Sequence, residues 1–134
     1  MRVRGIHHVG VAVADLDEAI ETYVRLFAAT VELRDELEEQ GAEAVSLLVG
    51  DSRVELLAPT GEDTPVGRFL ARRGPGMHHL ALESADVEAT LRDLEAAGAQ
   101  LVDAHPRRGL FGKQVAFVHP TAVHGVLTEV VSSG

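Results

Sequence analysis

The stretch that decides the fold is residues 6–16, IHHVGVAVADL, because it recurs as residues 77–87, MHHLALESADV. Both copies begin with an apolar residue and two histidines, continue as strand-like residues, and end with Ala-Asp and an apolar residue. The offset is a constant 71 positions, from residue 6 to residue 77. A repeat at fixed spacing is the signature of a structural unit that is used twice. The sequence therefore predicts a single domain made of two similar modules, about 1–74 and about 75–134.

Each copy leads into the same order of secondary structure. Residues 5–13 alternate as a strand, and Asp15 followed by Glu18 predicts the start of a helix. The second module repeats this with a strand at 76–83 and a helix cap at Asp86. Three strands then follow in each module, expected at 29–35, 42–49 and 53–58 in the first and at 100–103, 113–119 and 125–131 in the second. Both modules thus read as βαβββ.

Two connecting segments have recognisable chemistry. Thr64 and Pro65 predict the N-cap and first turn of a short helix between the modules, which Gly74 closes. Residues 106–113, PRRGLFGK, are punctuated by glycine and basic, and they predict a loop. No linker separates the modules, which favours one fused domain.

Composition narrows the possible partners. The chain has 134 residues, of which 46% are hydrophobic and 25% charged, as in ordinary globular proteins. Twelve basic against twenty-one acidic residues give a net charge of −9, which argues against nucleic acid and anionic membranes as partners. No apolar run approaches the roughly 20 residues that span a bilayer, and the N-terminus does not resemble a signal peptide. There is no cysteine for disulfides or thiolate ligands, so we expect a cytoplasmic protein.

The second histidine of each pair shares its strand face with small residues. Adjacent strand residues face opposite sides of a sheet. His8 therefore lies with Gly10, and His79 lies with Ala81, whereas the opposite faces carry valines or leucines that pack on a helix. Small neighbours leave the space that the floor of a cavity needs. Four further histidines receive no specific role: His7 and His78, on the helix side or at the rim, and His105 and His124, in loops.

Each module ends in an apolar strand that carries one carboxylate, Glu55 in VELL and Glu129 in LTEVV. A buried, unpaired carboxylate costs several kcal/mol, so each should have a cation or hydrogen-bond donors. Two modules related by a pseudo-twofold axis would bring both carboxylates toward His8 and His79. A single histidine or glutamate in a strand is more often an ordinary core or surface residue than a metal ligand. The repeat, however, places the four residues at corresponding positions of the two modules, which favours a common role. The set suits one Zn²⁺, Co²⁺, Ni²⁺, Mn²⁺ or Fe²⁺ ion.

Further motifs extend the pattern along nearly the whole chain: IHHVGVAV at 6–13, EQG at 39–41, VELLAP at 54–59, DTPV at 63–66, GMHHLA at 76–81, FVHP at 117–120 and GVLTE at 125–129. With these motifs the chain resembles the methylmalonyl-CoA epimerase family of the vicinal oxygen chelate superfamily. The resemblance implies an α+β fold in which two tandem βαβββ modules form a half-barrel around a metal site. It also places the family's metal ligands at His8, Glu55, His79 and Glu129.

The resemblance implies an isomerase that inverts the α-carbon of methylmalonyl-CoA or a close acyl-CoA through an enolate. A metal ion would stabilise the enolate charge while a base removes the proton and an acid returns it. Glu129 is the candidate for one of these roles. Some family members carry a catalytic glutamate three residues after EQG, where this chain has Ala44, and Glu43 has the opposite strand parity. The second acid or base is therefore not identified.

Two alternatives stay open. A glyoxalase-type isomerase, such as a lactoylglutathione lyase, uses the same metal set to stabilise an enediolate. A non-catalytic binding protein of the bleomycin-resistance kind usually lacks the metal set, but the alanine at position 44 keeps this alternative in play. An extradiol dioxygenase fits least, because its site usually has two histidines and one glutamate.

An acidic chain that binds coenzyme A needs a local basic cluster. The densest candidates are Arg107, Arg108 and Lys113 in the 106–113 loop, which we predict to bind the substrate. A second group, on the connecting helix, is Arg68, Arg72 and Arg73. Superfamily members commonly pair, and exposed strand edges favour pairing, so we expect a homodimer.

Overall fold

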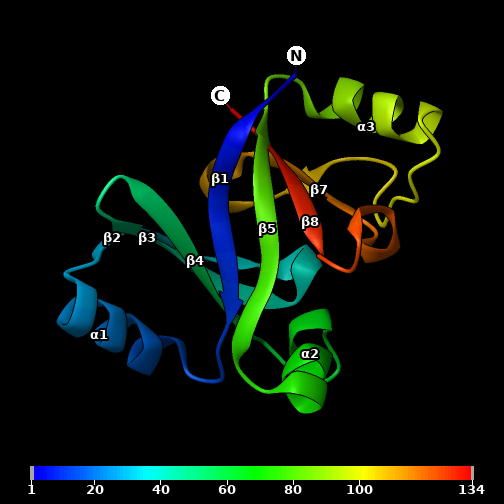
Figure 1. Ribbon diagram of the computed structural model, residues 1–134. Helices are drawn as coiled ribbons and strands as arrows, with labels where there is room; N and C mark the ends of the chain where they lie inside the picture. The colour runs from blue at the N-terminus through cyan, green and yellow to red at the C-terminus, as the bar shows by residue number, and fades with distance from the viewer. Residues whose placement is uncertain (1, 134) are drawn as a thin grey trace. The chain divides into compact units, whose positions relative to one another are not determined.

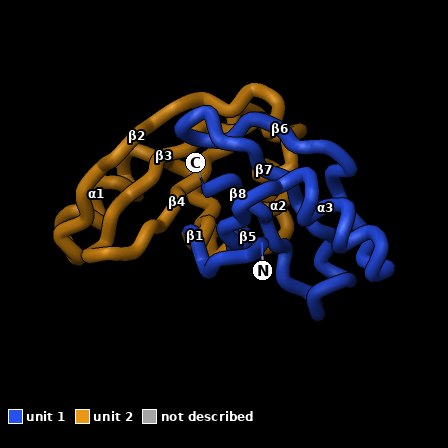
Figure 2. Tube along the Cα trace, turned by 90° about the horizontal axis from the view of Figure 1, so that it is seen from above, with its two compact units in different colours: residues 1–7, 79–134 blue, residues 8–78 orange. Residues whose placement is uncertain are grey.

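The computed structural model describes residues 2–133, which divide into two compact units (Figure 2). Unit 2 is one continuous segment, residues 8–78. Unit 1 is built from two segments, the N-terminal residues up to His7 and the described residues from His79 onward. The first strand therefore contributes to both units, with the change falling between the two adjacent histidines.

Unit 2 holds four strands in the order β2-β3-β4-β1. β1 pairs in parallel with β4, whereas β2–β3 and β3–β4 are antiparallel. The elements of this half are β1 (Val3–Ala12), α1 (Leu16–Phe27), β2 (Thr30–Leu37), a 3₁₀ turn (Glu38–Gln40), β3 (Ala42–Val49), β4 (Ser52–Pro59) and α2 (Pro65–Arg73). The strands predicted in the first module are confirmed (Figure 1).

Unit 1 repeats the pattern with strands in the order β5-β8-β7-β6. β5 pairs in parallel with β8, and β7 pairs antiparallel with both β8 and β6. Its elements are β5 (Gly76–Ser84), α3 (Val87–Ala96), β6 (Arg107–Arg108), a 3₁₀ turn (Leu110–Gly112), β7 (Gln114–Val118), a second 3₁₀ turn (Pro120–Val123) and β8 (Thr128–Ser132). The predicted α+β class with two tandem βαβββ modules is therefore confirmed.

The helix starts follow the predicted caps. The Asp15 carboxylate accepts from the Glu18 N–H at 3.0 Å, and the Asp86 carboxylate accepts from Ala89 N–H at 3.0 Å. Thr64 Oγ1 caps α2 at 3.1 Å. Such caps satisfy N–H groups that the first helical turn leaves unpaired, and each contributes about 1 kcal/mol.

In unit 2, α1 covers one face of the sheet (Figure 1). Leu16 of α1 packs with Val45, Leu47 and Leu56 of β3 and β4. Val11 of β1 packs against the same cluster. The bulky residues of β1 and β4 therefore point toward the helix, which leaves the opposite face of these strands to His8 and Glu55.

In unit 1, α3 plays the equivalent part (Figure 1). Val87 and Leu91 of α3 pack on Ala116 and Val118 of β7 and on Val130 of β8. Since Val130 faces the helix, its neighbour Glu129 lies on the opposite face of the sheet.

The strand predicted at 100–103 is wrong. Leu101 makes an isolated bridge to β7, and the short edge strand is β6, Arg107–Arg108, inside the segment predicted as a loop. The Asp103 carboxylate accepts from the Phe117 N–H at 2.9 Å. A side chain thus replaces the backbone acceptor that a regular strand would present to β7, which explains why strand pairing does not extend through this segment.

Within residues 2–133, no helix is both long enough and apolar enough to cross a membrane.

Candidate metal centre

His8 is buried on the face of β1 that sequence alternation predicts. Its side chain is 4% exposed, and the burial of β1 alternates so that His8, Gly10 and Ala12 are buried while His7 and Val9 are partly exposed. A glycine and an alanine beside His8 leave room above this part of the sheet. His8 is therefore a buried polar group on a face lined by small residues.

Within unit 2, His8 meets the carboxylate of Glu55. His8 Nε2 lies 3.1 Å from Glu55 Oε2, and Glu55 is also buried. The pairing follows from the parallel register of β1 and β4, in which Gly10 is opposite Glu55. The two candidate ligands of the first module are thus brought together.

Burial raises the pKa of Glu55 to about 8, from a usual 4.5. Removal of the carboxylate from water penalises the charged form, and this is the cause of the shift. Burial therefore favours the neutral carboxyl at this position in the metal-free chain. A divalent cation beside it would favour the charged form instead.

Within unit 1, His79 and Glu129 form the second pair. Both are 3% exposed, and His79 Nε2 lies 3.9 Å from Glu129 Oε1, which is longer than a hydrogen bond. The Phe117 ring packs edge-on against the His79 imidazole, with ring centroids 5.5 Å apart. Both members of this pair are therefore buried, and an aromatic ring lies against the histidine.

The two pairs occupy equivalent positions in the sheet. Glu55 is opposite Gly10 in the parallel β1–β4 register, and Glu129 is opposite Ala81 in the parallel β5–β8 register. Gly10 and Ala81 each lie two residues after the second histidine of their pair. The repeat seen in the sequence is therefore reproduced in strand pairing, and it carries one buried histidine and one buried carboxylate in each unit.

The donor set fits a divalent metal ion. His8, His79 and Glu129 are buried side chains that each offer one ligand atom of the kind such ions bind. Imidazole nitrogen and carboxylate oxygen together suit zinc and its neighbours in the first transition row. Burial disfavours the charged form of Glu55, so a nearby cation would stabilise this carboxylate most. These residues support a metal site without selecting the metal.

The other histidine of the second pair has a different environment. His78 packs edge-on against Phe69 of α2, with ring centroids 5.0 Å apart, and burial lowers the pKa of its imidazole. This contact agrees with its assignment to the helix side of β5.

Three polar residues that the sequence did not single out lie on the same face of unit 2 as Glu55. Ser46 of β3 is directly opposite Glu55 in the antiparallel register, and Arg53 precedes Glu55 by two residues on β4. Glu32 of β2 accepts from Ser46 Oγ at 2.8 Å and from Arg53 Nε at 2.9 Å. We call this face of β1–β4, with His8, Glu55, Ser46, Arg53 and Glu32, the polar face.

The position of the family's additional glutamate carries no acid here. Ala44 is fully buried and lies on the polar face, since it is opposite Leu57 two residues from the Ser46–Glu55 pair. Glu43 faces the other way, as its parity predicts: its carboxylate accepts from Arg34 at 2.9 and 3.2 Å, and Arg34 also pairs with Asp17 of α1. Glu43 is thus held on the helix side of the sheet.

The three predicted substrate-binding residues of the 106–113 segment make different contacts. Arg107 pairs with Asp103 at 3.2 Å and lies over the Phe117 ring at 6.0 Å. Lys113 Nζ donates to the Ser132 and Ser133 carbonyls at 3.2 and 3.3 Å. Arg108 is exposed. The segment is therefore partly tied to its own unit, and Arg108 has the most exposed charge of the three.

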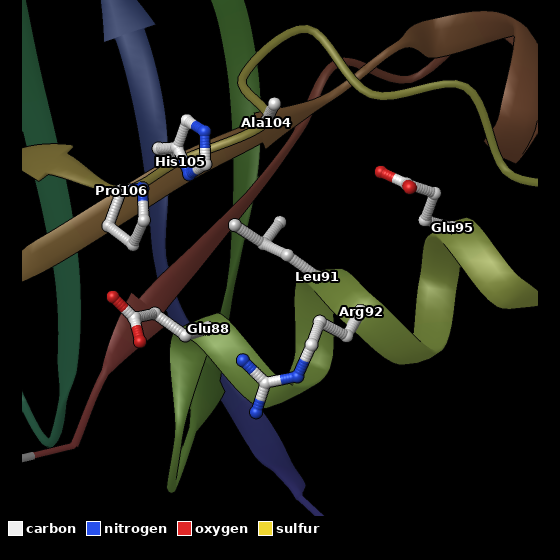
Figure 3. Close-up of a pocket in the computed structure, with 7 residues that line it drawn as sticks. All are labelled: Glu88, Leu91, Arg92, Glu95, Ala104, His105 and Pro106. Carbon is white, nitrogen blue, oxygen red and sulfur yellow. The ribbon is translucent and has the colours of Figure 1, made fainter.

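A hollow of about 550 Å³ lies elsewhere in unit 1, between α3 and the segment before β6 (Figure 3). Glu88, Arg92 and Glu95 reach it from α3, and His105 and Pro106 line its other side. Its charged side chains are exposed, and it includes neither histidine–carboxylate pair.

Residues 7–117 match the family model of the Glyoxalase/Bleomycin resistance protein/Dioxygenase superfamily. The match spans both histidine-pair strands and most of both modules. The chain therefore belongs to this superfamily.

Within the superfamily, several of the similar proteins are named methylmalonyl-CoA epimerases. The human mitochondrial enzyme is 34% identical over 93% of this chain and 72% of its own length. The crystal structure of methylmalonyl-CoA epimerase from Mycobacterium tuberculosis is 36% identical, with a TM-score of 0.94 over 98% of this chain and 89% of its own. A structure of a methylmalonyl-CoA epimerase in complex with methylmalonyl-CoA and NH4+ is 39% identical, with a TM-score of 0.95 over 98% and 96% of the two chains. The resemblance predicted from sequence motifs is confirmed.

Proposed function

We propose that this chain is a metal-dependent epimerase that inverts the α-carbon of methylmalonyl-CoA. The observation that carries the proposal is the pair of buried histidine–carboxylate contacts at equivalent strand positions, in a chain that is similar to named methylmalonyl-CoA epimerases along nearly its whole length. An acyl-CoA is accordingly the proposed small-molecule partner.

The two pairs would serve one ion. His8 and Glu55 come from the first module and His79 and Glu129 from the second, and the resemblance to the epimerase family implies these four positions as its metal ligands. One divalent ion per chain, Co, Zn, Ni or Mn, is the proposed cofactor. When bound, such an ion supplies Lewis-acid stabilisation of the negative charge that develops on the thioester oxygen.

The chain's own residues would handle the proton. Glu129 is the proposed acid–base residue, because it is a buried carboxylate opposite Phe117 in the β7–β8 register and belongs to the proposed ligand set. Glu43 is directed to the helix side by Arg34 and does not compete for this role.

The deciding experiment is an assay of two reactions with purified protein. We expect the chain to exchange the α-proton of methylmalonyl-CoA with solvent deuterium and to interconvert its epimers, and not to isomerise the hemithioacetal of methylglyoxal and glutathione. A chelator should abolish the first reaction, and added divalent metal should restore it. Hemithioacetal isomerisation without epimerisation would reject the proposal in favour of the glyoxalase-type alternative.

We also propose a homodimer and a cytoplasmic location. Exposed apolar residues at the end of α1 and on β2, among them Phe27 at 59% and Leu26 at 56% exposure, favour pairing. Sedimentation at micromolar concentration tests the first proposal, and a monomer alone would reject it. Cell fractionation tests the second.

A further inference from the structure

Arg53 is held in one orientation by a carboxylate from a neighbouring part of the sheet. Its Nε donates to Glu32 Oε1 at 2.9 Å, and its second terminal nitrogen lies 3.4 Å from Glu32 Oε2. The Glu32 side chain is only 17% exposed, and Ser46, itself buried, also donates to it. This arrangement fixes both the arginine and its partner at the border of the buried part of the polar face.

A β-bulge puts Glu32 in this position. The register of β2 on β3 shifts between Val31, opposite Leu47, and Leu33, opposite Ser46. Glu32 is the extra residue of the bulge, so it shares the side of Ser46 with Leu33. Bulges redirect side chains and are frequent next to active sites. The contact therefore depends on a local irregularity that brings an acid onto the polar face.

Glu32 accepts only some of the hydrogen bonds that the Arg53 guanidinium can donate. A guanidinium has five N–H donors, and Glu32 takes the Nε–H and one from a terminal nitrogen. Across residues 2–133, the Arg53 side chain has no acceptor other than Glu32. Three N–H donors of an oriented guanidinium thus remain for a molecule outside the chain, and the side chain is 39% exposed.

Arg53 also lies close to the candidate metal ligands of unit 2. It precedes Glu55 by two residues on the same face of β4. The parallel register that pairs Val9 with Val54 puts Arg53 level with His8. A ligand that reaches the His8–Glu55 pair would therefore pass within the range of a long, oriented arginine.

We propose that Arg53, positioned by Glu32, binds an oxyanion of the thioester substrate, either the acyl carboxylate or a coenzyme A phosphate. The inference rests on the proposed function and extends it to a substrate-recognition residue. A guanidinium fork matches carboxylate and phosphate geometry better than any other side chain. A chain of net charge −9 also needs a fixed local cation to hold an anionic ligand.

The test is direct binding to the metal-loaded protein, measured by calorimetry with three probes. Methylmalonyl-CoA carries both oxyanions, methylmalonyl-pantetheine lacks phosphates, and propionyl-CoA lacks the acyl carboxylate. Arg53→Ala should raise the Kd of methylmalonyl-CoA about tenfold or more, the size typical of a lost charge-assisted hydrogen bond. If, of the other two probes, only methylmalonyl-pantetheine also binds more weakly to Arg53→Ala, the arginine binds the acyl carboxylate. If only propionyl-CoA does, the arginine binds a phosphate.

Arg34→Ala is the matched control. Arg34 is also an arginine of this sheet paired with a glutamate, but it lies on the opposite face. Its removal should leave all three Kd values unchanged. Glu32→Gln should weaken binding less than Arg53→Ala, since it loosens the arginine without deleting it, and should raise KM with little change in kcat.

The outcomes separate this inference from the proposed function. Epimerase activity in the wild type with unchanged Kd values in Arg53→Ala overturns the role of Arg53 alone. Arg53-dependent binding without epimerisation by the wild type overturns the proposed reaction and leaves the oxyanion site. A wild type that binds none of the three probes overturns the inference.

Discussion

The two histidine–carboxylate pairs share a position in the sheet but have different surroundings. In unit 2, His8 and Glu55 are 3.1 Å apart, and polar residues such as Ser46 lie beside them. In unit 1, His79 and Glu129 are 3.9 Å apart, and the Phe117 ring packs on the imidazole. The internal repeat thus preserves the candidate ligands while their neighbours differ.

The difference suggests a division of labour. Apolar surroundings strengthen electrostatic interactions and exclude water, which suits the proton transfer proposed for Glu129. Polar surroundings with an oriented arginine suit recognition of a charged substrate, as inferred for Arg53. Equivalent substitutions in the two halves should therefore have unequal effects on the reaction but equal effects on the metal.

Loss of either histidine should have the largest effect. We expect His8→Ala and His79→Ala each to reduce metal affinity by more than the roughly 10–100-fold that loss of a residue behind the ligands typically costs. The wild type should bind about one divalent ion per chain. Metal content after dialysis, with circular dichroism as a check of folding, measures this.

His7→Ala and His78→Ala are the controls, because these side chains belong to the other face of their strands. Metal loss in the controls and retention in His8→Ala and His79→Ala would reverse the assignment of faces.

Replacing each carboxylate by its amide should affect kcat differently at Glu129 and Glu55. Glu129→Gln and Glu55→Gln both keep an oxygen ligand, but only the first removes the proposed acid–base group. We expect Glu129→Gln to lower kcat by roughly 10²–10⁴, as for loss of general acid–base catalysis. Glu55→Gln should retain most activity, since it keeps the ligand oxygen and removes no proposed acid–base group. Exchange of the α-proton in deuterium oxide measures both, and equal losses would refute the division of labour.

The basic segment of unit 1 should have a smaller effect. We expect Arg107→Ala combined with Arg108→Ala to raise KM for the CoA thioester about tenfold, the size of a lost charge-assisted phosphate contact. Metal content should not change. Because Arg107 pairs with Asp103, the single variant Arg108→Ala should account for most of the increase. Steady-state kinetics measure it, and an unchanged KM would reassign the segment to plain surface.

The pH dependence of stability tests the unit 2 pair in the metal-free protein. The pKa of Glu55 is about 8 in the folded chain and 4.5 as its usual value. Between these values the folded state holds the extra proton, so the stability of the metal-free protein falls as pH rises, on the order of 1 kcal/mol per pH unit. Below 4.5 and above 8 this contribution is flat. Urea unfolding from pH 5 to 8 measures the slope, which Glu55→Gln or bound metal should remove; an equal slope in Glu55→Gln would assign it to other groups.

The sequence alone was sufficient to predict which face of its strand each of the two histidines occupies. The alternation of small and bulky residues around His8 and His79 determines which side each faces, and capping residues mark the helix starts. Patterns of this kind involve residues close together in the chain, so the sequence alone predicts their structure.

The polar cluster around Glu32 could not be predicted in the same way. Its position depends on a bulge of β2, and nothing in the residues around Glu32 specifies where the register shifts. The same limit applies to the segment before β6, where the Asp103 side chain accepts from the Phe117 N–H in place of a backbone acceptor. Contacts between residues far apart in the chain decided both cases.

The division of unit 1 into two segments has a consequence for the order of folding during synthesis. The Arg2 backbone carbonyl accepts from the Ala85 N–H at 2.8 Å, and the Arg2 guanidinium pairs with Asp93 at 3.3 Å. These contacts close a loop of more than eighty residues, and β8 of the same unit lies still later in the chain. Chains emerge from the ribosome N-terminus first, so residues 8–78 are available to fold as a unit while the first residues still wait for their partners. Arg2 is therefore made before unit 2 but secured only after it.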